Sequence, residues 1–324
     1  RYAFVVRASL GDAQGRPLRA DNRFIALRDG ATPEGRRGAA LAALYRPLWE
    51  TLPMVGVARD EVVTATVFTT GDVVADTAAL GDRVLARHDV QVEGLQLAPG
   101  DSPATHPRFC QLNGFVRMPQ FQRGVAPYNT DGTFELDAEG TPIRQTVTAP
   151  ANYDRVPVTF TLPRSAMPAE GYPLVLYLHG SGGLSTQAVD RGTWRPQAPD
   201  FPCPPGSEQW EGVTGCNTLG QGPAYLLAPR GFATAAAALP VNPERLPGAA
   251  GTAYLNLANL RAFRDTFRQG VLESRLFVEA LGGVRIPAAL VAQCTGASLP
   301  AGATEARYDL SRLIATEQGK PIAE

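Results

Sequence analysis

The chain has 324 residues, of which 44% are hydrophobic, so it is long enough for a sizeable core and for more than one domain. Its formal net charge of −1 gives no overall excess of positive charge to attract nucleic acid or anionic lipid. No apolar run approaches the roughly 18 residues that a membrane-spanning helix needs. These features argue against a nucleic-acid-binding protein and against a transmembrane segment.

The first 94 residues predict a region that combines strands and helices. Residues 2–10 and the β-branched stretch 62–73 have strand patterns. Residues 34–51 carry leucines at helical spacing, and 76–87 predict another short helix.

Residues 95–150 are dominated by Pro, Gly, Asp and Thr and predict a connector that wraps the following domain. Two strands are expected around its end, at 143–150 and 156–163. We therefore expect three parts: an N-terminal region over 1–94, the connector, and a further domain over 151–324.

The second half alternates strands with helices. The elements expected there are a buried strand at 173–180, a short helix at 222–231, a strand at 232–240, a long helix at 254–283 and a strand at 308–316. This alternation predicts an α/β fold with a mostly parallel sheet covered by helices. The residues of the long helix expected to pack on the sheet are Leu260, Phe263, Phe267, Val271, Val278 and Leu281.

The segment LYLHGSGG, residues 176–183, places a glycine-rich turn at the carboxyl end of the buried strand. Backbone N–H groups that are not screened by side chains can stabilise an oxyanion during acyl transfer. The candidate donors are Gly180, Ser181 and Gly182, with His179 shaping the loop. The alternative is an ordinary glycine-rich turn.

This segment resembles the oxyanion loop of α/β-hydrolase esterases and lipases. The stretches ALPVNPERLPG and 252–281 look like large bacterial extracellular esterases or lipases that carry Ig-like modules, and the first strands look like the end of such an Ig-like region. The resemblance implies a carboxylic ester hydrolase with a Ser-His-Asp mechanism and no cofactor. It also implies a small-molecule or lipid ester substrate and an extracellular, periplasmic or cell-surface location in a bacterium.

In such hydrolases a strand like 308–316 runs into a G-x-S-x-G nucleophile elbow. Here EQGKPIAE follows, and Gly319 stands where the pattern has serine. We therefore expect the nucleophile beyond residue 324, on the same protein or on a second chain that carries the C-terminal half, and we expect residues 1–324 alone to be inactive. Two alternatives stay open: a divergent or foreign end, since Lys320 is the chain's only lysine, and a loss of catalysis.

Ser181 is a second candidate nucleophile, because H-G-S-G-G is one residue short of G-x-S-x-G. It has no histidine after His179 to serve as its base.

Four residues beyond the strand ends could line a substrate pocket, with core or loop-anchoring roles as the alternative. They are Asp190, Trp194, Asn242 and Glu244.

The four cysteines show no CxxC spacing and the three histidines are scattered, which argues against a metal site. Cys203 and Cys216 flank a Pro- and Gly-rich loop whose closure would contribute roughly 3 kcal/mol, so a bridge between them is expected. Cys110–Cys294 is a further possible bridge, and buried free thiols are the alternative. The competing function is a noncatalytic surface or adhesion protein that uses a hydrolase-like scaffold for binding.

Overall fold

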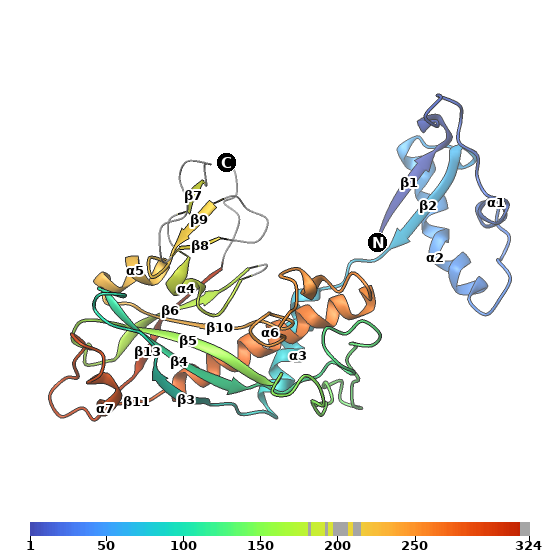
Figure 1. Cartoon of the computed structure of the whole chain (residues 1–324). Coiled ribbons are helices and arrows are strands. Elements are labelled where there is room, and N and C mark those ends of the chain that lie inside the picture. Colours follow the sequence, from blue (N-terminus) through green and yellow to red (C-terminus); the bar gives the residue numbers. More distant parts are fainter. Residues whose placement is uncertain (181–182, 192–193, 197–206, 210–214, 318–324) are drawn as a thin grey trace. The chain divides into compact units, whose positions relative to one another are not determined.

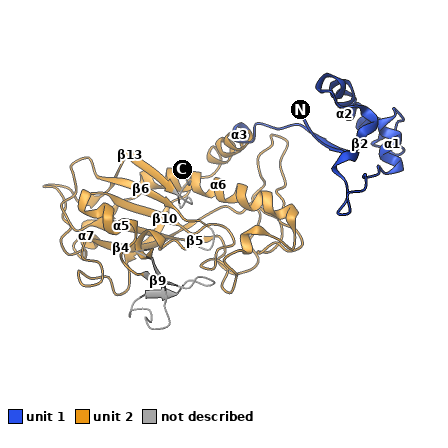
Figure 2. Ribbon diagram, turned by 90° about the horizontal axis from the view of Figure 1, so that it is seen from above, with its two compact units in different colours: residues 1–75 blue, residues 76–324 orange. Residues whose placement is uncertain are grey.

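The structure is a computed structural model, and it describes residues 1–180, 183–191, 194–196, 207–209 and 215–317. The chain divides into two compact units, residues 1–75 and 76–324 (Figure 2). The division falls inside helix α3 (Val73–Leu85), most of which belongs to unit 2.

Unit 1 consists of one two-stranded antiparallel sheet and two α-helices. Strand β1 (Tyr2–Arg7) pairs with β2 (Val62–Phe68), and the helices are α1 (Asn22–Arg28) and α2 (Gly38–Thr51). Its core contains Leu27, Leu48, Trp49, Leu52, Val62 and Ala65. The helix expected over 34–51 is therefore present. The β-rich Ig-like architecture is not supported, because the single sheet of this unit packs on helices, whereas an Ig-like sandwich has a second sheet in that place.

Unit 2 is built on a six-stranded sheet in the order β13-β6-β10-β5-β4-β3 (Figure 1). The strands are β3 (Val92–Leu97), β4 (Phe109–Arg117), β5 (Arg155–Pro163), β6 (Tyr172–Leu178), β10 (Ala233–Ala237) and β13 (Tyr308–Glu317). Its longest helix is α6 (Leu260–Gly283), and shorter ones are α4 (Gln187–Asp190), α5 (Pro223–Leu227) and α7 (Ala288–Val291). The remaining strands are short: β7 (Trp194–Pro196), β8 (Ser207–Gln209), β9 (Gly215–Thr218), β11 (Ile286–Pro287) and β12 (Glu305–Ala306).

The α/β class is confirmed, but the expectation of a mostly parallel sheet is wrong. Strand β6 is parallel to β10 and β13, whereas β10–β5, β5–β4 and β4–β3 are antiparallel pairs. The antiparallel half arises because β4 and β5 pair along their full length, Phe109 with Pro163 and Arg117 with Arg155. Strand β4 lies inside the stretch interpreted as a connector, and residues 143–150 form an isolated bridge at Gln145 where a strand was expected.

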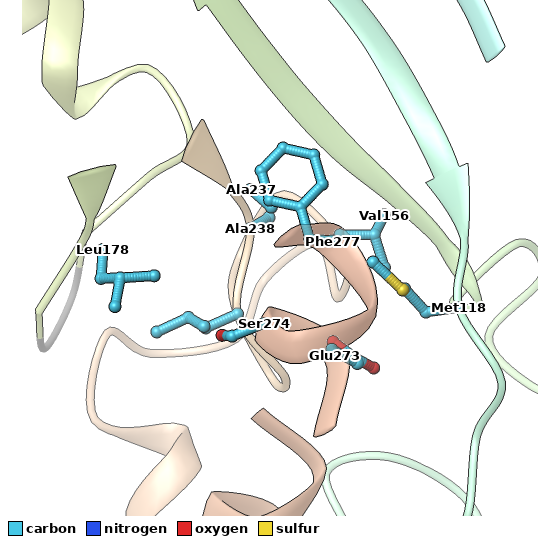
Figure 3. A pocket seen from close by; sticks show the side chains of 9 residues that line it. Met118, Val156, Leu178, Ala237, Ala238, Glu273, Ser274 and Phe277 are labelled. Carbon is cyan, nitrogen blue, oxygen red and sulfur yellow. The ribbon is translucent and has the colours of Figure 1, made fainter. Parts of the chain in front are cut away.

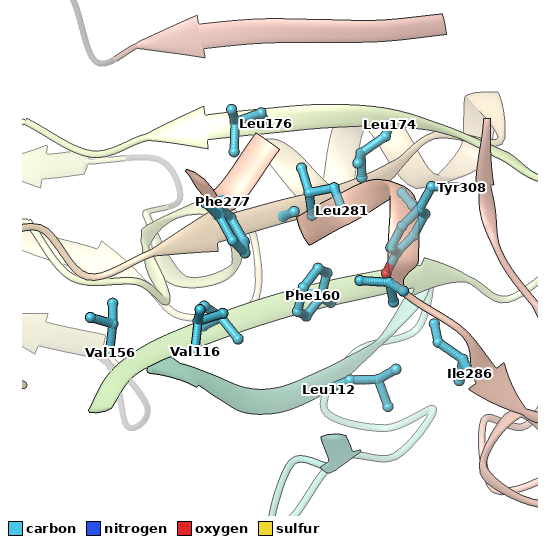
Figure 4. Close-up of a cluster of buried hydrophobic side chains, with 14 of the residues drawn as sticks. Leu112, Val116, Val156, Phe160, Leu174, Leu176, Phe277, Leu281, Ile286 and Tyr308 are labelled. Atoms are coloured by element: carbon cyan, nitrogen blue, oxygen red, sulfur yellow. The ribbon is translucent and has the colours of Figure 1, made fainter. Parts of the chain in front are cut away.

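Helices cover both faces of the sheet. Leu174 and Leu176 of β6 join the core cluster that includes Phe277 and Leu281 of α6 (Figure 4). The next residue of β6, Tyr177, packs instead with Ala188 of α4 on the opposite face. This alternation is the period of two that a strand buried on both faces requires.

The second half of helix α6 packs on the core as expected, through Leu281 and the partly buried Val278, but its first half turns a different face inward. Leu281 is buried, but Phe263 and Phe267 are 38% and 48% exposed, and Leu260 and Val271 are exposed as well. The first half of the buried face is polar instead and includes Asp265, Thr266, Gln269 and Glu273. The reason is that these side chains hydrogen-bond to the irregular segment 118–134, whose polar groups need partners. Asp265 and Gln269 accept from its backbone N–H groups. Thr266 and Glu273 accept from the side-chain amides of its glutamines.

A disulfide joins β4 to the segment after α7. Cys110 and Cys294 are bonded, with their Cα atoms 5.7 Å apart and a separation of 184 positions in sequence. This is one of the two bridges considered from the sequence. The other expected bridge joins Cys203, which lies outside the described part of the chain, to Cys216, which is described only as backbone.

We predict that replacing both Cys110 and Cys294 by serine lowers the free energy of unfolding by about 2–5 kcal/mol, because the bridge closes a long loop in the unfolded chain. Urea unfolding followed by circular dichroism measures the loss. The double variant Cys203→Ser/Cys216→Ser, measured in the same way, gives the separate contribution of the other expected bridge, and a peptide map made without reductant identifies both pairings. Rapid alkylation of Cys110 and Cys294 in the unreduced native protein would contradict the prediction.

Candidate functional site

The candidate site lies where the parallel part of the sheet changes direction. From β6 the chain passes to β10 on one side, and then crosses to β13 on the other side. In open α/β sheets such a switch point leaves a crevice beyond the carboxyl ends of the strands. The segments that meet here are 179–186, which follows β6, and 238–245, which follows β10.

His179 joins these two segments through both nitrogens of its ring. Its Nε2 accepts a hydrogen bond from the N–H of Leu239 at 3.1 Å, and its Nδ1 lies 3.1 Å from the carbonyl oxygen of Gly180. Nε2 therefore carries no proton, and Nδ1–H is the donor to Gly180. Burial lowers the pKa of His179, which is 5% exposed. The imidazole is thus neutral and fixes the loop.

Asn242 and Glu244 hold the loop from the opposite side. The Asn242 amide donates to the carbonyl oxygen of Gly183. The Glu244 carboxylate accepts from the Ser185 N–H at 2.6 Å and from its hydroxyl at 2.8 Å. The Glu244 N–H in turn donates to Asn242 Oδ1 at 2.9 Å. Both residues were predicted to bind substrate, and in this structure they bind the loop after β6.

The environment of Glu244 opposes its charge. Burial raises the pKa of Glu244, and the two hydrogen bonds from Ser185 partly offset that rise. The carboxylate is held by a dedicated pair of donors because a partly buried charge needs compensating hydrogen bonds.

Gly183 is required by close packing within the loop. A Cβ at this position would lie 2.8 Å from the Cβ of His179 and 2.6 Å from Oε1 of Gln187. Both distances are shorter than real Cβ contacts, so any other residue would displace the loop. Gln187 is 5% exposed, and its Oε1 has no hydrogen-bond partner among the described residues.

The segment after β10 is strained and is held by buried groups. Val241 has a φ of 58°, which is costly for a β-branched residue. Its N–H donates to the hydroxyl of Tyr153 at 2.9 Å. Four residues further on, the fully buried guanidinium of Arg245 donates to both carboxylate oxygens of Glu273 on α6, at 2.6 and 3.1 Å.

The Arg245–Glu273 pair is part of a larger buried network. Arg245 Nε also donates to the carbonyl oxygen of Tyr153 at 3.2 Å, and its guanidinium carbon lies 4.6 Å from the centre of the Tyr153 ring. Glu273 Oε1 accepts from the side-chain amides of Gln120 and Gln269, each at 2.9 Å. These contacts fix the position of the 238–245 segment against α6. No sequence motif indicated this network.

A small cavity lies between α6 and the strand ends that carry the site. It measures about 10 Å³, room for one water molecule at most. Figure 3 shows Leu178, Ala237 and Ala238 facing Ser274 and Phe277 across it. A ligand larger than a water molecule therefore does not fit in this cavity.

The other predicted site residues lie apart from this cluster or outside the described residues. Asp190 ends α4 and accepts from the Gly220 N–H at 3.3 Å, and burial raises its pKa. Ser181 and Gly182 lie outside the described residues, and Trp194 is described only as backbone. Gly180 supplies the carbonyl oxygen that accepts from the N–H of Gly183.

Within the described part of the chain, no serine is paired with a histidine. His179 has both ring nitrogens occupied, His88 packs on the ring of Phe121, and Nδ1 of His106 contacts Asp101 at 2.7 Å. Ser185, which the sequence analysis did not single out, is 1% exposed, and its hydroxyl is hydrogen-bonded to Glu244. The described residues also contain no group of His, Cys, Asp and Glu that could hold a metal ion. The described arrangement can position backbone groups, but it supplies no histidine as a base for a serine.

No helix in the described residues is both long enough and apolar enough to cross a membrane. Comparison with known protein families finds none that matches the chain, and no curated protein matches it significantly.

We predict that His179 makes folding stability depend on pH. The native pKa of His179 lies below the unfolded value of 6.5, so the unfolded state binds a proton first as the pH falls. The free energy of unfolding therefore keeps its full value above pH 6.5 and declines below it. Relative to His179→Gln, the wild type should lose up to about 2 kcal/mol between pH 8 and pH 5. Urea unfolding at both pH values measures the difference, and an equal response of the two proteins would contradict the prediction.

We predict that Arg245→Met costs about 3–5 kcal/mol, because it leaves the charge of Glu273 buried without its partner. The double variant Arg245→Met/Glu273→Leu should lose less than the single one. The matched control is Arg285→Met, whose partner Glu305 is 3.2 Å away and half-exposed, with an expected loss below about 1 kcal/mol. Thermal and urea unfolding provide the comparison; similar losses for Arg245→Met and the control would show that the buried pair has no special role.

Proposed function

We propose that this protein is a secreted carboxylic ester hydrolase of the α/β-hydrolase type, in which residues 179–186 form the oxyanion loop. The observation that carries the proposal is the register between β13 and β6. Thr316 pairs with Tyr177 and Glu317 with Leu178, the residue before His179. A turn that follows β13 therefore begins beside the loop that follows β6.

This neighbourhood is the one that acyl-transfer chemistry needs. In α/β-hydrolases the nucleophilic serine sits on a strand-to-helix turn, and the oxyanion hole combines the N–H after the serine with an N–H from another strand-to-helix loop. Strand β6, the loop and helix α4 supply such a strand-to-helix loop. Each well-placed N–H donor contributes about 3–4 kcal/mol to stabilising the transition state.

The loop is held in place before any substrate binds. His179 attaches it to Leu239, Asn242 attaches it at Gly183, and Glu244 attaches it at Ser185. Preorganised donors avoid the cost of reorganisation during the reaction, which is the main source of oxyanion stabilisation.

The nucleophile and its base are proposed to come from residues beyond Glu324, on the same protein or on a second chain. Serine Oγ would attack the ester carbonyl carbon while the histidine takes its proton, and the histidine would return that proton to the departing alcohol. Water would then cleave the acyl-enzyme to release the acid. Ser185 does not fill the serine role, because its hydroxyl is buried and bound to the Glu244 carboxylate, and both ring nitrogens of His179 are already hydrogen-bonded.

The location outside the cytoplasm is part of the proposal. The Cys110–Cys294 disulfide supports it, because such bonds persist in oxidising compartments and are rare in the cytosol. A noncatalytic surface or adhesion protein remains the second candidate, favoured by the absence of a Ser–His pair from the described residues.

We predict that the protein continued past Glu324, as read from its gene, hydrolyses p-nitrophenyl esters and reacts with a fluorophosphonate probe, whereas residues 1–324 alone do neither. In the active form, Gly183→Ala should lower kcat by about 10²–10³ with little change in KM, since a Cβ there displaces the oxyanion loop.

The matched control is Gly283→Ala at the end of α6, where an added Cβ meets no atom within 4 Å and activity should be unchanged. If the reading frame stops at Glu324 with no second chain, and no ester is turned over, the hydrolase proposal fails and the noncatalytic function stands. Full activity in Gly183→Ala would instead exclude this loop as the oxyanion hole.

A further inference from the structure

The first half of α6 carries a row of exposed apolar side chains. Leu257, just before the helix, is 75% exposed, Leu260 is 70%, and Phe263, Phe267 and Val271 are also exposed. We call these five residues the apolar stripe. From Leu260 on they follow the spacing i, i+3, i+7, i+11, which places them along one side of the helix.

The apolar stripe is an ordered surface. The rings of Phe263 and Phe267 are 4.8 Å apart, and Tyr254 packs edge-on against Phe267 at 5.7 Å. Meanwhile the polar side chains of the same turns face inward, where Asp265 accepts from the N–H of Phe134 at 2.9 Å. The outward apolar face is therefore not a core face left uncovered by chance, because the helix already has a complete inner face. A contiguous exposed apolar patch marks an interaction surface.

Three arginines lie beside the apolar stripe. Arg261, Arg264 and Arg268 follow each other at helical spacing and form an adjacent row, which we call the arginine row. Arg264 is 64% exposed. The only acidic residue between positions 252 and 272 is Asp265, whose carboxylate is fully buried and already bound to Arg264 and Arg268.

We propose that the apolar stripe and the arginine row together dock the protein on an anionic lipid bilayer. Helices that lie in a bilayer interface combine Phe and Leu on one side with Arg or Lys on the flank, where the cations meet lipid phosphates. The charge complementarity favours an anionic lipid surface over a second copy of this chain, whose same face carries the same arginines. The chain's net charge of −1 conceals this local positive charge.

The docking surface is connected to the candidate site through the chain. Arg245 ends the site segment, Tyr254 lies between it and α6, and Tyr254 contacts Phe267 of the apolar stripe. A bilayer bound to this surface would therefore contact α6, which is also the helix that anchors the 238–245 segment. The inference concerns binding alone and stands without the proposed ester hydrolysis, so either can fail while the other holds.

We predict that residues 1–324 sediment with vesicles of equimolar phosphatidylcholine and phosphatidylglycerol, and much less with vesicles of phosphatidylcholine alone. Phe263→Ser/Phe267→Ser should weaken binding at least about 10-fold, since two partly inserted rings are lost. Arg261→Gln should weaken binding about fivefold on anionic vesicles only. Leu226→Ser is the matched control, a 60% exposed leucine on α5 at the other face of the sheet, and it should bind as the wild type does.

Unchanged circular dichroism and thermal unfolding verify that the variants fold. Independently, Phe267→Trp should show a blue-shifted emission with anionic vesicles and quenching by brominated lipid, relative to the wild type. The proposal is overturned if the wild type does not bind anionic vesicles, or if the double serine variant binds as well as the wild type. It is also overturned if light scattering finds a dimer that the same double variant dissociates, which would assign the apolar stripe to an interface between copies.

Discussion

The buried ion pair between Arg245 and Glu273 is the interaction on which the rest of the candidate site depends. Two charges inside a protein lose several kcal/mol of hydration each, and only complete hydrogen bonding offsets that cost. Here the guanidinium binds both carboxylate oxygens and the carbonyl oxygen of Tyr153, while Gln120 and Gln269 complete the shell of Glu273. Such a network tolerates little displacement, so α6 and the segment after β10 have one relative position.

The segment after β10 in turn fixes the loop after β6, because side chains of the segment hydrogen-bond to backbone groups of the loop. Arg245 holds the end of the segment, and the strained Val241 is held by the hydroxyl of Tyr153. Between them, Asn242 and Glu244 reach the loop at Gly183 and Ser185. A strained φ angle persists only where its surroundings over-determine it. The loop is therefore shaped by a helix that begins more than 70 residues after the loop ends. A motif such as HGSGG cannot reveal this dependence.

The sequence predicted most clearly those strands whose hydrophobic pattern matches their burial, namely β5, β6 and β10. It missed β4 because Gln111, Asn113 and Gly114 interrupt its apolar residues, and because its composition resembles that of the surrounding turns. It assigned the wrong face to the first half of α6, since hydrophobicity locates a core only where the core is apolar. In the site, His179, Asn242 and Glu244 could be located by their positions beyond strand ends, but their partners lie far away in sequence and carry no local signal.

The inverted first half of α6 has a physical cause that connects fold and surface. The segment 118–134 has little regular structure, so its backbone N–H and C=O groups need side-chain partners, and the helix supplies Asp265 and Gln269 for them. Once the inner face is polar, the apolar residues of an amphipathic helix can only face outward. Packing against segment 118–134 does not require apolar residues on the outer face of the helix. Exposed Phe263 and Phe267 would therefore only lower the solubility of the protein unless they bind a partner. The polar inner face of the helix thus follows from the fold. The apolar stripe and the arginine row on its outer face require a separate explanation, and the proposed contact with a lipid surface supplies one.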